Sequence, residues 1–309
     1  MPTDLSQIVE EALHVKVEDF NELVEKAIHL LSKEDGQVGG FTVIGRLIRI
    51  DPSGEAIIAS DLHGDLGSMT RILEETGFLQ RATKNSKLFL ILLGDYGDRG
   101  MQSAEVYYVV LKLKLLFPEQ VILMRGNHEG PDDLLASPHD LPVQFQTRFG
   151  ENWNRAYLKI RELFQHLYNA VIIGEYYLII HGGLPSEAKN LEDLAYAHTR
   201  HPKQRLLEDM LWSDPTEYIE EVCRSPRGAG RLFGEKITDR VLRRFNVKIL
   251  IRGHEPSRDG FKIDHGGRII TLFSRKGPPY FNAHGAYLNI DLSRSLEDAR
   301  QLIPFIHKL

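Results

Sequence analysis

Short apolar runs alternate with segments of helical periodicity along most of the chain. Apolar runs short enough to be buried strands lie at 88–93, 120–124 and 171–180. Apolar residues at helical spacing predict helices over 17–33, about 65–76, about 103–116 and roughly 151–168. The order strand, helix, strand, helix, strand between residues 55 and 124 predicts parallel pairing, and therefore an α/β fold.

The remaining segments are read from their turn residues. A hairpin is predicted where residues 41–50 and 55–60 flank the turn Asp51-Pro52-Ser53-Gly54. The stretch 130–142 is rich in Pro, Asp and Leu and predicts a surface loop, and 224–234 is basic and flexible in composition. Strand-like runs within 247–292 are separated by Gly and Pro, so the sheet is expected to end in antiparallel or mixed strands.

No linker long enough to mark a domain boundary interrupts the pattern. The simplest organisation is one α/β domain over residues 41–309, with residues 1–40 as a helical segment packed on its core. A chain of 309 residues can bury a core of this size.

Composition narrows the kinds of function that are possible. The net charge of −5 gives no general attraction to nucleic acid or to an anionic membrane. No run of 18 apolar residues occurs, and the first residues lack the order of a secretory signal, so we expect a soluble, cytoplasmic protein. The single cysteine, Cys223, excludes an intramolecular disulfide and any multi-thiolate metal site. A metal would need His, Asp, Asn and water, which favours manganese, iron or zinc.

Polar residues follow five apolar runs at the point where each predicted strand ends. The five stretches read AIIASDLHGD (56–65), LGDYGDRG (93–100), VILMRGNHE (121–129), YLIIHGGL (177–184) and KILIRGHE (248–255). Any one of them is explained as well by a polar turn as by chemistry. Five sets of carboxylates and imidazoles at strand ends indicate a metal cluster, because open α/β sheets gather ligand-handling groups at the carboxyl ends of their strands.

These residue types suit the hydrolysis of a phosphate ester by two metal ions. Asp61 and His63 can reach one ion, and Asp95 can bridge to a second ion that Asn127, His181 and His254 complete. His128 is then available as the general acid for the leaving oxygen, with Asp98 orienting its ring. Arg99 and a second arginine from 224–234 would clamp the phosphate.

In order and spacing these motifs resemble the PPP-type serine/threonine phosphoprotein phosphatases, within the calcineurin-like metallophosphoesterases. The resemblance extends to Leu211-Trp212-Ser213-Asp214-Pro215, to Pro226-Arg227-Gly228 and to Leu272-Phe273-Ser274, and it covers about residues 20–291. It implies a central β-sandwich of two mixed sheets flanked by helices, which makes 41–309 a metallophosphatase catalytic domain.

The resemblance also implies the ligand and catalytic roles given above, residue by residue. It adds Arg227, Arg252, Tyr280 and Asn127 as residues that contact the substrate phosphate. The sequence departs from the usual motifs of this family at two places. Gly97 replaces a usual Val and is expected to loosen the turn that carries Asp98. The loop 130–142 does not match the usual continuation after Glu129. Because that loop borders the substrate groove, substrate range is left open.

The function expected is a metal-dependent phosphomonoesterase that acts on phosphoserine and phosphothreonine in proteins, with a hydroxide bridging two divalent metal ions, Mn²⁺ first among them, as the nucleophile. Its partners are phosphoprotein substrates, with no nucleic acid and no membrane, and with a regulatory subunit unknown. A hydrolase of dinucleoside polyphosphates such as diadenosine tetraphosphate and a catalytically silent scaffold are the alternatives.

Several residues outside the motifs are expected to have no function in the site. They include Arg231 and Arg275, expected to be solvated at the surface, and the histidines His14, His29, His139, His166, His198, His201, His265, His284 and His307.

Overall fold

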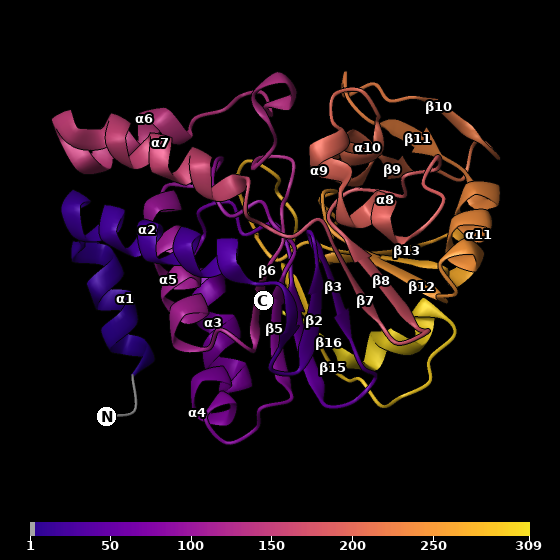
Figure 1. Ribbon diagram of the computed structural model, residues 1–309, viewed down its shortest axis with the longest axis horizontal. Coiled ribbons are helices and arrows are strands. Elements are labelled where there is room, and N and C mark those ends of the chain that lie inside the picture. Colours follow the sequence, from indigo (N-terminus) through magenta and orange to yellow (C-terminus); the bar gives the residue numbers. More distant parts are fainter. Residues whose placement is uncertain (1–3) are drawn as a thin grey trace.

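The computed structural model describes residues 4–309 as stacked layers of helices and two mixed sheets (Figure 1). The larger sheet contains, in spatial order, β1 (Gly36–Val38), β2 (Phe41–Ile44), β3 (Leu47–Ile50), β7 (Ala170–Ile173), β8 (Tyr177–Ile180), β12 (Ile249–Arg252), β14 (Ile269–Leu272) and β13 (Phe261–Asp264). The second sheet contains β16 (Ile306–Lys308), β15 (Ala286–Asp291), β4 (Glu55–Ala59), β5 (Leu88–Leu92) and β6 (Val121–Leu123). Two mixed sheets flanked by helices are the architecture that the family resemblance implied.

Helices cover both outer sides of this sandwich (Figure 1). On one side lie α1 (Leu5–His14), α2 (Val17–Lys33), α3 (Leu66–Thr76), α4 (Phe78–Ala82), α5 (Ser103–Leu116), α6 (Leu141–Phe149) and α7 (Trp153–Phe164). On the other lie α8 (Leu191–Ala195), α9 (Ala197–Arg200), α10 (Leu206–Trp212) and α11 (Glu235–Arg244), with a small sheet of β10 (Val222–Arg224), β11 (Arg231–Phe233) and β9 (Asp214–Pro215).

The central strands β7 and β8 of the larger sheet are buried on both faces because they alternate apolar side chains between two cores. Tyr177 and Ile179 of β8 belong to the core that it shares with the other sheet, whereas Leu178 and Ile180 belong to the core under α8–α11. The layering therefore follows from strands that are apolar at every position.

The predicted parallel run is confirmed. β4 pairs with β5 and β5 with β6, both in parallel, and α3, α4 and α5 form the crossovers. The three carboxyl ends therefore lie at the same edge of one sheet. The mixed character of the last third is also confirmed, since β12 pairs in parallel with β8 and β14 while β13 pairs antiparallel with β14.

The predicted hairpin across Asp51–Gly54 is wrong. Residues 41–50 are themselves a hairpin, because the chain reverses at Gly45, whose φ is +57°, and β2 pairs antiparallel with β3. β4 lies in the other sheet, between β5 and β15. The turn therefore carries the chain from one sheet to the other.

Two further segments differ from the prediction. The helix α6 begins at Leu141, inside the stretch expected to be loop, with Pro142 in its first turn, where proline fits a helix. In the stretch 224–234, expected to be flexible, residues 231–233 form β11, which pairs antiparallel with β10, while residues 225–230 form the irregular connection between the two strands. In both places turn-forming residues were read as loop although they begin or connect elements.

The N-terminal helices share the main core with the sheets and are tied to it by a buried ion pair. Glu34, just after α2, accepts a hydrogen bond of 2.7 Å from Lys114 of α5, and the Lys114 side chain is fully buried. Glu34 also accepts a hydrogen bond from the Tyr168 hydroxyl. The boundary at residue 40 stays a prediction. Over residues 4–309 no helix is both long and apolar enough to cross a membrane.

Replacing Glu34 by Gln is expected to lower the free energy of unfolding by about 3 kcal/mol, because the buried Lys114 ammonium loses its counter-charge. Urea unfolding followed by circular dichroism measures the change. Adding Lys114→Met should recover more than half of the loss, since the double variant no longer buries a lone charge. A loss below about 1 kcal/mol in Glu34→Gln would contradict this account of the pair.

Candidate metal centre and substrate cleft

The predicted metal ligands meet where strand ends of the two sheets face each other. Asp61 and His63 follow β4, Asp95 follows β5 and Asn127 follows β6, whereas His181 and His254 follow β8 and β12 of the larger sheet. All six side chains are buried. Each sheet therefore supplies part of one site.

The backbone at these strand ends is unusual. Among residues 4–309, nine non-glycine residues have positive φ, and six of them are the motif residues Asp61, His63, Asp95, Asp98, Arg99 and His254. Side chains other than glycine rarely adopt this conformation, and such strain collects at functional sites. Tight left-handed turns explain how neighbouring residues such as Asp61 and His63 both point into the site.

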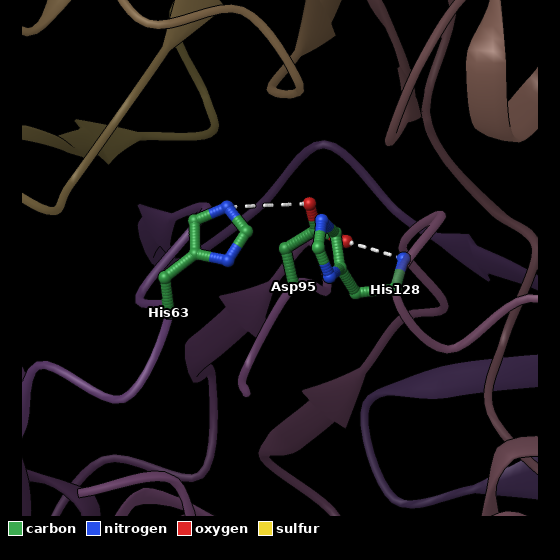
Figure 2. A group of neighbouring side chains, drawn as sticks. All are labelled: His63, Asp95 and His128. Carbon is green, nitrogen blue, oxygen red and sulfur yellow. Dashed lines mark hydrogen bonds and ion pairs between the residues drawn. The ribbon is translucent and has the colours of Figure 1, made fainter. Parts of the chain in front are cut away.

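The first ligand group centres on His63, which Figure 2 shows beside Asp95 and His128. Its Nε2 lies 3.5 Å from Asp95 Oδ2 and 3.8 Å from Asp61 Oδ1. The other ring nitrogen, Nδ1, lies 3.0 Å from the carbonyl oxygen of Gly97 and donates to it, which leaves Nε2 with its lone pair directed at the two carboxylates.

The second group surrounds Asn127. The Asn127 Oδ1 lies 3.0 Å from His181 Nε2 and 2.9 Å from His254 Nδ1, and His181 Nε2 lies 3.5 Å from Asp95 Oδ1. The His181 Nδ1 donates to the carbonyl oxygen of Leu93 at 3.0 Å, so Nε2 is the ring nitrogen directed into the site. Asp95 therefore has one oxygen toward each group.

The chemistry of these atoms fits cations. Asp61 Oδ1 is buried with no hydrogen-bond partner, whereas Oδ2 accepts from Ser60 Oγ and from the His254 backbone N–H. The Asn127 oxygen faces acceptor atoms only, and a rotated amide would instead donate to Asp95, His181 and His254. Buried acceptors without donors are costly unless a cation lies among them. Two sets, His63 with Asp95 and His128, and Asp95 with His181 and His254, are compact enough to hold an ion.

Burial keeps two of the imidazoles in the neutral form that a metal needs, because it lowers the pKa of His63 to about 3 and that of His254 well below its usual value. Burial also raises the pKa of Asp61 to about 6, which favours the protonated acid, so a bound cation would have to hold this group as a carboxylate. Burial opposes ionisation of Asp95 as well, but the charges of His181 and His128 outweigh it and hold the Asp95 pKa well below its usual value. Burial lowers the pKa of His181, but the carboxylates of Asp95 and Asp61 outweigh it and raise that pKa to about 9, so this imidazole must lose a proton when it binds a metal. Neutral His63 and His254 and an ionised Asp95 are already metal-binding forms.

His128 and Asp98 form a close pair beside the first group. His128 Nδ1 lies 2.6 Å from Asp98 Oδ2, and the His128 backbone N–H donates to Asp95 Oδ1 at 3.0 Å (Figure 2). Because Asp98 occupies Nδ1, only Nε2 of this ring is left for an ion or a proton transfer. Burial lowers the pKa of His128, but the carboxylates of Asp95 and Asp98 outweigh it and raise that pKa.

Asp98 also binds a second imidazole, which contradicts the expectation that His139 has no place in the site. His139 Nδ1 lies 2.9 Å from the same Asp98 Oδ2 that His128 contacts. The expectation for Gly97 is also wrong: a Cβ there would lie 2.9 Å from the Tyr107 ring and 3.2 Å from Leu141, so the turn is closely packed rather than loose. His139 and Leu141 lie far from the 93–100 motif in sequence, so the motif alone could not predict their contacts with Asp98 and Gly97.

A cleft of about 860 Å³ opens over the ligand groups. Its walls include Arg99, Arg227 and Tyr280, three of the residues expected on the substrate phosphate, together with the loop residues 133–138. The Tyr280 ring packs against His63, with 5.4 Å between ring centroids. The loop between β6 and α6 therefore lies beside the site, as the sequence predicted.

Arg252 does not reach this cleft, although it was expected there. Its side chain is fully buried, and its guanidinium donates to Asp214, to Glu255 and to the carbonyl oxygen of Gly182. Asp214 accepts from Arg252 at 2.8 Å through one oxygen and from Arg227 Nε at 2.6 Å through the other. Asp214, to which no role was assigned, thus holds Arg227 at the cleft wall.

Glu129 is the other residue whose role the sequence did not reveal. One carboxylate oxygen accepts from the backbone N–H groups of Asp95 and Gly126, and the other accepts from the Tyr96 N–H and the Tyr107 hydroxyl. It therefore joins the loops after β5 and β6, which carry Asp95 and Asn127. In the sequence, the role of Glu129 was indicated only by its place in the motif Gly126-Asn127-His128-Glu129.

Arg231 and Arg275 are not free surface residues, contrary to expectation. Arg231 pairs with the buried Asp209 and with Glu187. Arg275 donates through Nη1 to the carbonyl oxygen of His63 at 2.6 Å. Arg275 thereby supports the turn that carries a ligand.

The comparisons with known proteins agree with this geometry. The chain belongs to the calcineurin-like phosphoesterase family, whose profile matches residues 56–258. It is 32% identical to a probable serine/threonine-protein phosphatase of Encephalitozoon cuniculi over 83% of this chain and 54% of that protein. It is 29% identical to the serine/threonine-protein phosphatase 4 catalytic subunit of Saccharomyces cerevisiae over 70% of this chain and 68% of that one.

A solved structure of a protein serine/threonine phosphatase from Saccharomyces cerevisiae, described as similar to human phosphatase PP5, shares the fold. Its TM-score is 0.72 at 24% identity, over 90% of this chain and 83% of that chain. The chain spans about half the length of the Encephalitozoon cuniculi relative.

Replacing Glu129 by Gln is expected to weaken metal binding about 10- to 100-fold, because the amide NH₂ would face backbone donors and the two loops would lose their link. Calorimetric titration of metal-stripped protein with Mn²⁺ measures this. Glu151→Gln, which changes an exposed acid, is the matched control. Equal affinities for both variants would refute the linking role.

Asp95→Asn should reduce the number of ions that the protein retains, because Asp95 is the one side chain that faces both ligand groups. The amide keeps the size of the side chain and tolerates a positive φ. Elemental analysis after gel filtration measures retention, and unchanged metal content would rule out the bridging position.

Proposed function

We propose that the protein is a metal-dependent phosphomonoesterase that hydrolyses phosphoserine and phosphothreonine in proteins. The observation that carries the proposal is the convergence of unpartnered acceptor atoms, led by the buried Asp61 Oδ1, beneath a cleft lined by Arg99 and Arg227. A phosphate dianion that binds here would need positive charge around it. Cations below the cleft and guanidinium groups on its wall would supply that charge. The phosphatases among the relatives support the choice of substrate.

The side chains divide the work. Asp61, His63, Asp95, Asn127, His181 and His254 would hold two divalent ions, which supply an activated water and neutralise charge on the phosphate. Arg99 and Arg227 bind the phosphoryl oxygens, and Asn127 and Tyr280 line the same space. His128 protonates the leaving oxygen from Nε2, and Asp98 keeps the proton on Nδ1 and fixes the plane of the ring.

Arg252 acts in this proposal through Asp214 and Arg227 rather than on the phosphate. The ions are Mn²⁺ first, with iron or zinc as alternatives, since oxygen and imidazole ligands accept all three. The site is proposed to work in the cytoplasm on phosphoprotein partners.

A second candidate is a hydrolase of dinucleoside polyphosphates, since the same ligand groups serve any phosphate ester. The volume of the cleft favours neither substrate. The serine/threonine phosphatases among the relatives favour the protein substrate, and rates on the two substrate classes decide between them.

His128→Asn is expected to lower kcat on a phosphothreonine peptide by about two to four orders of magnitude, because the leaving alkoxide would lose its proton donor. The measurement is phosphate release by metal-stripped protein resupplied with Mn²⁺. His307→Asn, on the distant strand β16, is the matched control and should keep the wild-type rate. A near-normal rate in His128→Asn would remove His128 from the mechanism.

If the folded, metal-loaded wild-type protein releases no phosphate from the peptide, the protein-phosphatase proposal fails. Hydrolysis of diadenosine tetraphosphate under the same conditions would then support the second candidate.

A further inference from the structure

The loop between β6 and α6 reaches into the acid pair of the site through one side chain. His139 Nδ1 lies 2.9 Å from Asp98 Oδ2, and Asp98 Oδ1 accepts the backbone N–H of Leu141 at 2.6 Å. With His128 on the same Oδ2, the Asp98 carboxylate accepts from two imidazoles and one backbone amide. Asp98 therefore depends on this loop as much as on its own turn.

The His139 ring is itself held from behind. Its Nε2 lies 3.0 Å from the hydroxyl of Tyr157 on α7, and the two ring centroids are 5.8 Å apart. Both Nδ1 atoms lie within hydrogen-bond distance of a carboxylate oxygen that can only accept, so both carry protons. These hydrogen bonds outweigh the effect of burial and hold the Asp98 pKa well below its usual value. A continuous chain of contacts thus runs from Tyr157 through His139 and Asp98 to His128.

The same loop also engages the neighbouring arginine. Arg99 donates through Nη1 to the Pro138 carbonyl at 3.0 Å and through Nη2 to the Ser137 carbonyl at 3.3 Å. The loop is also anchored at Asp133, on the cleft wall and without a contact to Asp98, where His201 Nε2 lies 2.9 Å from Asp133 Oδ2. Anchoring the loop and supporting Asp98 are therefore separate contacts, made by two different histidines.

We propose that His139 is a positioning residue for the acid step: it fixes the Asp98 carboxylate and, through Asp98, the ring of His128. This inference rests on the proposed function for its effect on rate. A carboxylate with one fewer donor is free to rotate, and His128 then spends less time aligned with the leaving oxygen. The loss of rate caused by removing His139 should be larger for substrates whose leaving group is a poor one that must be protonated.

Kinetics on two substrates separate this role from a structural one. His139→Ala is expected to lower kcat about tenfold on a phosphothreonine peptide, whose alkoxide must be protonated. On p-nitrophenyl phosphate, whose phenolate leaves readily, the expected loss is about twofold, and KM should change little for either substrate. His139→Asn, which can still donate to Asp98, should recover most of the loss.

His201→Ala is the matched control, because it removes a histidine that anchors the same loop without contacting Asp98. It should leave the ratio of the two rates at the wild-type value. If His139→Ala lowers both rates equally or mainly raises KM, or if His201→Ala shifts the ratio as much, His139 only anchors the loop and the proposal is wrong.

A readout without turnover keeps this inference distinct from the proposed function. Imidazole N–H protons that are buried against a carboxylate give separate downfield proton signals in water. The wild-type protein should give one for His128 and one for His139, and His139→Ala should remove one and shift the other. A His128 signal that does not move would overturn the proposal even in an active enzyme. An inactive wild-type protein that passes this test would refute only the proposed function.

Discussion

The site is governed by the need to compensate charge that the fold buries. Asp61, Asp95, Asp98 and Glu129 are all at most 2% exposed, at the edge where two sheets meet. A buried carboxylate is tolerated only when donors or cations surround it. Asp98 and Glu129 have their donors within the protein, from imidazoles, backbone N–H groups and a tyrosine hydroxyl. Asp61 and Asp95 are left with oxygens directed at lone pairs, and the left-handed turns that hold them there are sustained by the packing of the strands beneath.

Most residues of the site could be predicted from the sequence because the metal-binding side chains directly follow predicted strands. Asp61, Asp95 and Asn127 each follow a run too apolar to lie anywhere but in a sheet, and parallel pairing was enough to bring their ends together. The same pattern, an apolar run ending in a polar motif, identified His181 and His254 of the other sheet, and the family resemblance supported both. Elements were predicted equally well where periodicity was strong, as in α3 and α5, which span the predicted residues to within about one position.

The features that the sequence did not predict mostly depend on contacts between segments far apart in the chain. Asp214, which binds Arg252, is distant from it in sequence, so the position of Arg252 outside the cleft could not be predicted from its own motif. The hairpin at Gly45 was missed because residues 41–50 were read as one strand across Gly45-Arg46, and the helix α6 was missed because its proline was read as a loop signal. His139 is an ordinary residue of an irregular loop, and only the folded chain shows that it contacts Asp98.

The close packing at Gly97 links two parts of the chain that would otherwise vary independently. Leu141, at the start of α6, fills the space that a side chain at position 97 would occupy, and it is also the residue whose backbone binds Asp98. A graft that exchanges the 131–140 loop for one of different shape would shift Leu141 and open a hole beside Gly97. A valine introduced at 97 alone would have to displace it. Gly97 and the 131–140 loop therefore depend on each other. A graft or recombination that transfers one of them into a relative has to transfer the other as well.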